Sequence, residues 1–272
     1  MLTHFYKTIL FDMKKLSIFF FLIAVNIQLS ASIMVLNGLT HIHTTSAGSQ
    51  IKGKILVKNQ SAKESRILLY TQDLMVSCGQ NVEYTDINKH NRSLGNWLKT
   101  NIDEKILSPN EEYTIHYTIN IPQENVEKGT YWSVLMVEGA DPIKEETNNG
   151  MQVNSKVRYA IQVLADIGGF ESPKLSFEDV KYDGKDKVNK TIKITMKNEG
   201  AFSAKTKISL EIFSDKGEKI KILEAIQKRI YPNLCNDFEI ELKGIPKGKY
   251  EGIIVADNGK DMFGSNITLD VD

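Results

Sequence analysis

The chain has 272 residues, of which 41% are hydrophobic and 25% are charged, and its formal net charge at pH 7 is zero. This length and composition suit about two ordinary packed domains, and the lack of a basic surplus argues against binding to nucleic acid or to an anionic membrane surface. Proline is scarce and no low-complexity tract is present, so we expect no long disordered region after the N-terminal segment.

Residues 1–32 have the features of a secretory signal peptide. Lys14–Lys15 precede the apolar run Leu16–Val25, which is shorter than the ~20 residues that span a bilayer. Small residues follow at Ser30–Ser32, where we expect cleavage, and Met13 is an alternative start. We therefore expect an exported protein without a membrane span in its mature form. An N-terminal anchor helix is the alternative.

The two cysteines, Cys78 and Cys235, fall in different predicted domains. A disulfide between them would have to cross the interface between the domains, and disulfide geometry is demanding. We expect two unpaired, buried thiols, and we expect that disulfides do not hold the fold together.

Apolar residues that alternate with polar ones, or that form a short continuous run as in Tyr131–Val137, predict a series of strands in a first domain of residues 33–166. The expected strands are Ile51–Lys58, Arg66–Asp73, Ile106–Leu107, Tyr113–Ile121, Tyr131–Val137 and Val153–Leu164. The polar segment Ser77–Asn101 is expected to be irregular, with one helical turn at Ser93–Leu98 that places Trp97 on a sandwich edge. Asp141–Met151 is acidic and rich in Asn, and we expect a mobile loop there.

A compact hinge with Gly168–Gly169 and Pro173 leads into a second domain, residues 167–272. Turn signals with glycine, such as Asp183–Gly184 and Asp257–Gly259, separate seven short predicted strands, and this spacing is typical of a β-sandwich. These strands are Leu175–Tyr182, Thr191–Lys197, Lys205–Phe213, Lys219–Leu223, Phe238–Leu242, Tyr250–Ala256 and Ile267–Val271.

One pattern occurs twice in the chain. Ile121–Pro122 is followed by Lys128–Tyr131 and an apolar strand, and Ile245–Pro246 is followed by Lys247–Tyr250 and a second apolar strand. A tyrosine at this point, after a Pro–Gly turn, is typical of the corner that precedes strand F of an immunoglobulin-like sandwich. The sequence therefore predicts an all-β fold of two tandem immunoglobulin-like β-sandwiches.

No phosphate-binding loop, HExxH, GxSxG or CxxC motif is present, so we expect neither an enzyme nor a cofactor. His41 and His43 lie on one face of a possible strand, and with His116 they would be candidate ligands of a transition metal. Without a placed third ligand we favour surface histidines and expect no metal. Asp257 and Asp261 flank a glycine turn, and turn chemistry accounts for both of them.

The two tryptophans, Trp97 and Trp132, are of a kind that stacks on sugars in some binding proteins. Large aromatic side chains in a sandwich more often pack in the core or on its edge, and we favour that role for both.

The first domain resembles a known family. Gly129–Glu138, an acidic loop with Pro142, and Ser155–Ile161 resemble the F1 strand, the F1–G1 loop and the G1 strand of periplasmic pilus chaperones, the PapD-like superfamily. Asn59 and Pro109 fit the same pattern. The stretch is also similar to the immunoglobulin-like domains of bacterial surface proteins that interact with WxL proteins. The resemblance covers residues 33–166, and the second domain matches only as an immunoglobulin-like fold.

In pilus chaperones the G1 strand completes the sandwich of a subunit by strand addition, in which main-chain pairing provides affinity and alternate side chains fix the register. The resemblance implies partner-binding residues on this strand: Val153, Lys156, Val157, Arg158, Tyr159, Ile161 and Val163. Arg158 and Lys156 fall near the lysine that holds the carboxylate of the subunit in that family, but Leu36–His41 offers no match to the partner arginine. The alternative is that the apolar face packs in the core of its own domain and that Lys156 and Arg158 are solvated.

The resemblance therefore implies an exported, chaperone-like binding protein of the bacterial periplasm or cell surface. We expect it to capture another exported or surface protein by pairing with the G strand of its first domain. The alternative is a surface adhesion or peptidoglycan-binding module.

Overall fold

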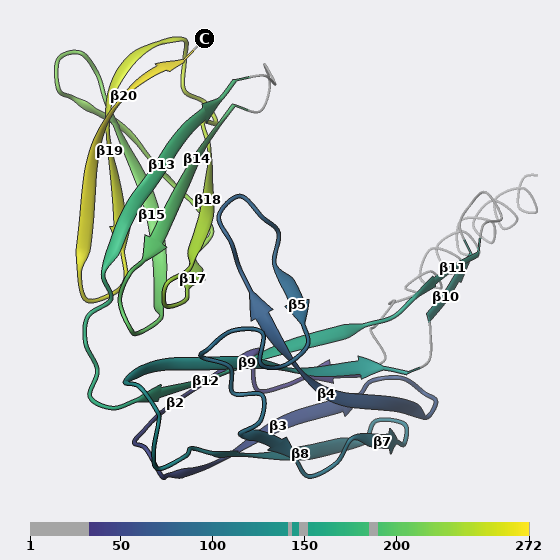
Figure 1. The fold of residues 1–272 in the computed structure, drawn as a ribbon. Coiled ribbons are helices and arrows are strands. Elements are labelled where there is room, and N and C mark those ends of the chain that lie inside the picture. The colour runs from purple at the N-terminus through teal and green to yellow at the C-terminus, as the bar shows by residue number, and fades with distance from the viewer. Residues whose placement is uncertain (1–32, 141–142, 147–151, 185–189, 272) are drawn as a thin grey trace, which may run out of the picture.

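The structure is a computed structural model that describes residues 33–140, 143–146, 152–184 and 190–271. These residues form strands and no helix, and the strands build two β-sandwiches that meet at an angle (Figure 1). The predicted all-β, two-sandwich fold is confirmed. No described segment is a helix of the length and apolar character that a bilayer crossing requires. The expected signal peptide, residues 1–32, lies outside the described residues, as does Pro142.

The first sandwich packs two sheets against each other. One sheet has the order β1 (Ile33–Val35), β3 (Gln50–Asn59), β8 (Glu112–Asn120) and β6 (Leu98–Thr100). The other has the order β2 (Thr40–Thr45), β12 (Arg158–Ile167), β9 (Gly129–Gly139), β4 (Ser65–Met75) and β5 (Glu83–Thr85), and β7 (Glu104–Leu107) also pairs with β4. The first segment of the chain thus contributes β1 to one sheet and β2 to the other.

A separate hairpin of β10 (Ile143–Glu146) and β11 (Gln152–Ser155) extends beyond the ends of β9 and β12 (Figure 1). The expected mobile loop at Asp141–Met151 is therefore partly wrong, because β10 lies within it and pairs with β11. The predicted strand Val153–Leu164 is divided into β11 and β12 at Lys156–Val157.

The second sandwich contains every strand that the sequence predicts for it. One sheet has the order β13 (Leu175–Asp183), β14 (Thr191–Asn198) and β18 (Cys235–Glu241). The other has the order β16 (Lys219–Glu224), β15 (Ala204–Phe213), β19 (Gly248–Asp257) and β20 (Met262–Val271), and β17 (Lys228–Ile230) also pairs with β15. The short connection 168–174 joins β12 to β13.

Both predicted tyrosine corners are present. The Tyr131 hydroxyl accepts a hydrogen bond from the backbone N–H of Glu127 at 3.1 Å, and the Tyr250 hydroxyl donates one to the carbonyl of Pro246 at 3.0 Å. Each phenol therefore ties the start of its strand to the turn four residues upstream. At the first corner, Gly129 has φ +132°, and a Cβ there would lie 2.3 Å from the Ala201 carbonyl of the second sandwich.

Each sandwich also contains one buried asparagine with the same set of bonds. Asn59, at the end of β3, donates to the Leu107 carbonyl at 3.1 Å and accepts from the N–H of Ser61 at 3.0 Å. Asn198, at the end of β14, donates to the Ile230 carbonyl at 3.2 Å and accepts from an N–H two residues on at 2.9 Å. These amides replace strand pairing where each strand leaves its sheet.

The predicted turn at Ser93–Leu98 is confirmed. The N–H groups of Trp97 and Leu98 both donate to the carbonyl of Leu94, at 2.7 and 2.8 Å. The Trp97 ring then packs on Tyr131 with a centroid distance of 4.9 Å. Trp97 is partly buried and Trp132 is buried, so both tryptophans have the packing role that we favoured.

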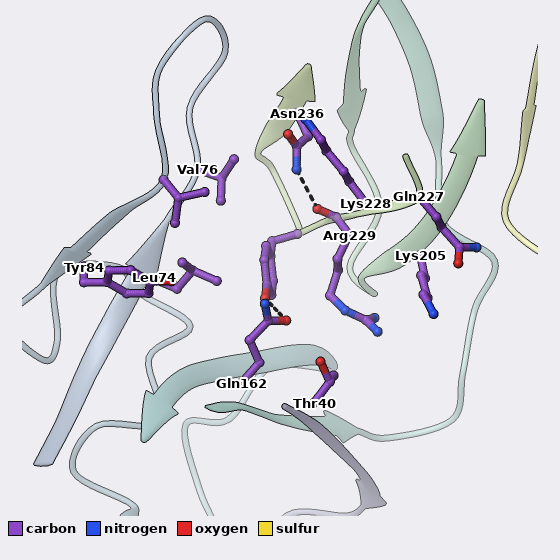
Figure 2. Close-up of a pocket in the computed structure, with 12 residues that line it drawn as sticks. Thr40, Leu74, Val76, Tyr84, Gln162, Lys205, Gln227, Lys228, Arg229 and Asn236 are labelled. Atoms are coloured by element: carbon purple, nitrogen blue, oxygen red, sulfur yellow. Dashed lines mark hydrogen bonds between the residues drawn. The ribbon is translucent and has the colours of Figure 1, made fainter. Parts of the chain in front are cut away.

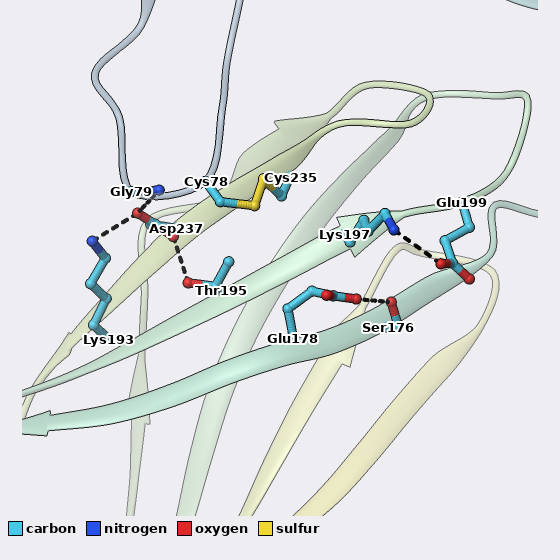
Figure 3. The surroundings of a disulfide bond; sticks show 10 residues. All are labelled: Cys78, Gly79, Ser176, Glu178, Lys193, Thr195, Lys197, Glu199, Cys235 and Asp237. Atoms are coloured by element: carbon cyan, nitrogen blue, oxygen red, sulfur yellow. Dashed lines mark hydrogen bonds and ion pairs between the residues drawn. A yellow bond between two sulfur atoms is a disulfide. The ribbon is translucent and has the colours of Figure 1, made fainter.

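Cys78 and Cys235 form a disulfide, so the expectation of two unpaired thiols is wrong (Figure 3). Their Cα atoms are 5.2 Å apart, although 157 residues separate them in the sequence. The chain after β4 leaves the first sandwich and reaches the start of β18 in the second, where the N–H of Gly79 also donates to Asp237 at 3.0 Å. Sequence patterns carry no information on this long-range approach, so a bridge between domains could not be foreseen.

An aromatic cluster joins the two sandwiches beside the disulfide. Trp132, on the outer face of β9, stacks on Tyr231 of the second sandwich with a centroid distance of 4.6 Å. The Tyr231 hydroxyl donates to the side chain of Gln162 in β12 at 2.9 Å, and the N–H of Thr130 donates to the Ala201 carbonyl at 2.9 Å. The domain interface therefore combines apolar packing, hydrogen bonds and one covalent bond.

Candidate binding edge and cleft

Part of β12 has an unpaired edge. β9 pairs with β12 along its whole length, whereas β2 covers the other side only from Gln162 to Ile167. No described strand pairs with Arg158–Ile161 on that side. Val157 accepts from Gly139 at 3.0 Å on the β9 side, and Gln162 donates to Leu39 at 2.9 Å on the β2 side. Because main-chain groups alternate between the two sides of a strand, those of Arg158 and Ala160 face the open side.

The open edge continues into the β10–β11 hairpin. Among the described strands, β11 pairs only with β10, so its other side is also unpaired. The chain runs from β11 into β12 through Lys156–Val157, and Figure 1 shows both strands along one line away from the second sandwich. Residues 152–161 therefore offer one extended, interrupted edge to a partner strand.

The sequence-predicted site residues have different surroundings in the structure. Ile161 and Val163 are fully buried, with 0% of each side chain exposed, in the core of the first sandwich. Their side chains therefore have the core-packing role that was our alternative, and only their backbone lies along the strand. Tyr159 packs on the same core and donates to the carbonyl of Ile33 at 2.7 Å, and burial raises its pKa. Val153 lies in β11, opposite Glu145.

Lys156 and Arg158 converge on one carboxylate, that of Glu138. Lys156 lies 3.3 Å from Glu138 and Arg158 lies 2.7 Å from it, while the Tyr70 hydroxyl donates to the same group at 2.7 Å. The hydrogen bond from Tyr70, followed by those from the two cations, lowers the pKa of Glu138. Burial and the bond to Glu138 raise the pKa of Tyr70 to about 12. These cations are half-exposed but already paired, so neither is a free anchor for a carboxylate.

A cavity of about 410 Å³ lies between the two sandwiches, next to the end of the open edge (Figure 2). Gln162 of β12 lines it, two residues after Ala160. One wall is apolar and comes from β4, β5 and the loop between them. The facing wall is basic and belongs to the second sandwich. The apolar wall contains Leu74, Val76, Val82 and Tyr84, and the basic wall contains Lys205, Lys228 and Arg229.

The three cations of the basic wall are held in different ways. Arg229 is largely buried and donates to the Ser203 hydroxyl at 3.0 Å, and this burial lowers its pKa although Asp166 is nearby. Lys228 donates to the carbonyl of Asp237 at 2.5 Å. Lys205 forms no ion pair with any described residue. None of the described residues that line the cavity is a carboxylate, so an anion that entered it would meet a wall of net positive charge.

The sequence-based reasoning missed this basic wall. The family resemblance covered only the first domain, whereas the three cations come from β15 and β17 of the second. In the sequence, Lys205, Lys228 and Arg229 cannot be told from ordinary surface residues. Only the fold places them opposite Leu74 and Tyr84. No local signal could have found them.

The candidate metal ligands do not converge as a set. His41 and His43 both contact the Tyr117 hydroxyl, whereas His116 is exposed on β8. Within the described part of the chain, no group of three or more His, Cys, Asp or Glu side chains is arranged to hold a metal. Asp257 accepts from the N–H of Gly259 at 2.7 Å, as expected for turn chemistry.

The chain is similar in structure to periplasmic pilus chaperones over most of its length. The match to the class 5 fimbrial chaperone CfaA covers 88% of this chain and 99% of the other, with 16% identity and a TM-score of 0.45. The match to a chain of the CsuC–CsuE chaperone–tip adhesion subunit complex of Acinetobacter baumannii covers 87% and 98%, with 11% identity and a TM-score of 0.48. The match to the YadV chaperone covers 88% and 100%, with 11% identity and a TM-score of 0.43. At these identities the likeness concerns the fold. No protein-family model and no curated protein matches the chain.

Proposed function

We propose that this protein is an exported, non-enzymatic binding protein that captures an extended segment of another exported or surface protein along β11 and β12. The observation that carries the proposal is the unpaired edge at Arg158–Ile161, where no described strand lies next to β12 on one side. An unpaired edge in the middle of a sheet is a template for strand addition, which joins two chains through main-chain hydrogen bonds.

A row of exposed apolar side chains borders this edge. Leu36 and Leu39 are 42% and 47% exposed, and both lie on the segment in which the chain passes from β1 to β2. This segment faces the open side of β12, since Tyr159 bonds to Ile33 and Gln162 bonds to Leu39. A partner strand on the edge would therefore bury its own apolar side chains against them.

We further propose that the partner segment ends in the cavity, with its C-terminal carboxylate on the basic wall. The edge leads toward Gln162, which lines the cavity, so a segment that ended there would run parallel to β12. Lys205 and Arg229 would pair with the carboxylate, and the last side chain would contact the apolar wall. Lys156 and Arg158 would flank the strand while remaining paired with Glu138.

The probe for this function is a set of short synthetic peptides that alternate apolar and polar residues, each made as a free acid and as an amide. Ala160→Pro removes one N–H that faces the open side and no bond to β9, so we expect peptide binding to be lost while the circular dichroism spectrum is kept. Unchanged affinity of a folded Ala160→Pro variant would reject edge pairing.

The cavity is tested with a matched pair of lysines on β15. Lys205 lines the cavity. Lys207 lies outside the cavity and forms an ion pair with Glu224 at 2.7 Å. We expect Lys205→Ala to abolish the preference for the free acid over the amide and Lys207→Ala to keep it. If the native chain sediments with purified peptidoglycan and the Ala160→Pro variant does so to the same extent, the wall-binding alternative is favoured instead.

A further inference from the structure

β2 is weakly attached to the first sandwich. Each of its six residues is exposed or only partly buried, and none belongs to the hydrophobic core. It pairs on one side only, with β12, and glycines at positive φ stand on both sides of it, Gly38 at +85° and Gly48 at +75°. A strand without core contacts has little apolar burial to oppose its release.

A polar contact that we name the His–Tyr clasp attaches β2 to the opposite sheet. His41 Nδ1 and His43 Nε2 lie 3.1 and 2.8 Å from the hydroxyl oxygen of Tyr117 in β8. The Tyr117 side chain is only 1% exposed, and its ring lies over Gly53 of β3, where a Cβ would be 2.0 Å from the ring. The phenol is thus held in place, and the two histidines bind to it.

The clasp requires at least one neutral imidazole. His41 Nε2 donates to the carbonyl of Gly38 at 3.4 Å, so its Nδ1 carries the lone pair that accepts the Tyr117 proton. The phenol oxygen then accepts from Nε2–H of His43. Protonation of both histidines would place a proton on each nitrogen that faces the phenol and leave the buried hydroxyl without an acceptor. It would also place two cations on one hydroxyl.

The surroundings of the clasp offer no compensating negative charge. Val163 and Ala165 of β12 lie beside His41 and His43, and Gly53 and Tyr117 face them from the other sheet. No described carboxylate pairs with either imidazole. Burial, and then the neighbouring His41, lower the pKa of His43 below its ordinary value of 6.5. The released strand therefore binds protons more tightly than the attached strand, and acid favours release as the pH falls below that value.

We propose that β2 is a detachable strand whose His41–Tyr117–His43 clasp opens on acidification and uncovers the β12 edge from Gln162 to Ile167. A longer partner segment that does not end in the cavity would then pair with β12 beyond Ile161. This use of the uncovered edge rests on the proposed function, whereas release of the strand does not.

The test uses amide hydrogen exchange of β12 by NMR, in the full chain without a partner, at pH 7.5 and pH 5.0. Amides of Gln162, Leu164 and Asp166 face β2, whereas those of Ile161, Val163 and Ala165 face β9 and serve as internal controls. After correction for intrinsic exchange, we expect protection of the first set to fall several-fold at pH 5.0 and that of the second set to stay constant. No change in either set, or an equal fall in both, would overturn the proposal.

Variants separate the clasp from general acid sensitivity. Tyr117→Phe keeps the ring on Gly53 and removes the hydroxyl, so we expect low protection of the β2-facing amides already at pH 7.5 and no further loss at pH 5.0. The pair His41→Gln and His43→Gln, which cannot gain charge, should abolish the pH dependence, and His116→Gln, an exposed histidine on the same β8, should keep it. A pH-dependent loss that persists in the double glutamine variant would reject the clasp.

The exchange experiment and the peptide experiment test separate claims, so either claim can be wrong while the other holds. If β2 is released but no peptide binds at either pH, the proposed function is wrong and the detachable strand remains. If peptides bind while the β2-facing amides stay protected at pH 5.0, the edge function remains and the detachable strand is wrong.

Discussion

At the scale of single residues, the buried amides of Asn59 and Asn198 hold the ends of β3 and β14. Asn59 donates to three carbonyls and accepts from Ser61, with no water-exposed surface. Asn59→Ala would leave these backbone groups unsatisfied, so we expect a loss of about 3 kcal/mol in the free energy of unfolding. Asn120→Ala, at an exposed asparagine on β8, should cost less than about 0.5 kcal/mol. Urea unfolding of both variants checks this, and equal losses would contradict it.

Glu138 should make the stability of the first sandwich sensitive to acid. Its pKa is lowered in the folded chain, so the stability from its carboxylate is present above its ordinary value of 4.5 and is lost as the pH falls through the folded pKa. We expect Glu138→Gln to be less stable than the native chain at pH 7 and to lose less stability in acid. Glu124→Gln, at an exposed carboxylate without an ion pair, is the control. Parallel acid transitions of native chain and Glu138→Gln would show the prediction to be wrong.

The role of a residue could be predicted from the sequence when its bonding partner lies only a few positions away in the chain. The tyrosine corners were predicted because Tyr131 and Tyr250 bond to backbone four residues away. The partner of Arg158 and Lys156 was not, because Glu138 reaches them through pairing of β9 with β12. Alternation placed Ile161 and Val163 on one face of a strand without showing whether that face meets the core or a partner.

At the scale of elements, Gly53 sets the distance between β3 and the Tyr117 ring. Gly53 and Tyr117 are opposite each other in the β3–β8 register, and the ring occupies the space of the missing side chain. Gly53→Ala should displace Tyr117, with a loss of about 1–3 kcal/mol in stability and weaker attachment of β2. Gly264→Ala on β20 meets only one backbone atom at 3.9 Å and should be nearly neutral. Thermal unfolding compares the two, and a neutral Gly53→Ala would contradict the packing argument.

Most of the predictable elements had an apolar period of two over at least five residues, and β9 was predicted from its continuous apolar run. The long strands of both sandwiches met one of these conditions, whereas β1, β2, β5 and β6 are short and have few buried side chains. β2 in particular has polar, half-exposed residues with His41 and His43 turned inward. Its position is set by pairing with β12 and by Tyr117, which no local pattern encodes.

At the scale of the whole molecule, the disulfide should determine how firmly the sandwiches are held together. Replacement of both Cys78 and Cys235 by Ala removes the bond but keeps the Trp132–Tyr231 contact. We expect both sandwiches to stay folded, the free energy of unfolding to fall by about 2–4 kcal/mol, and small-angle scattering to report a wider range of domain angles. Reducing agent should have the same effect on the native chain and none on the double variant. An unchanged scattering profile would show that the aromatic cluster alone fixes the angle.

The two-sandwich architecture could be predicted from the sequence, because each sandwich repeats a complete set of strand and turn signals. The relative placement of the sandwiches could not be, and neither could the cavity between them. Both depend on the excursion between β4 and β5, whose tip carries Cys78 and whose stem supplies Val76 and Val82.

The disulfide also has a mechanical consequence. A tension applied to the two ends of the oxidised chain passes across the Cys78–Cys235 bond, so the intervening segment, 157 positions from one cysteine to the other, cannot be extended. That shielded segment includes β9, β12 and the connection between the sandwiches. A single-molecule pulling experiment should therefore record the extension of the flanking residues only, and reduction should add ~3.3–3.6 Å of length for each residue released. A protein that binds another chain along β12 would thus prevent the extension of β12 while tension is applied to its own ends.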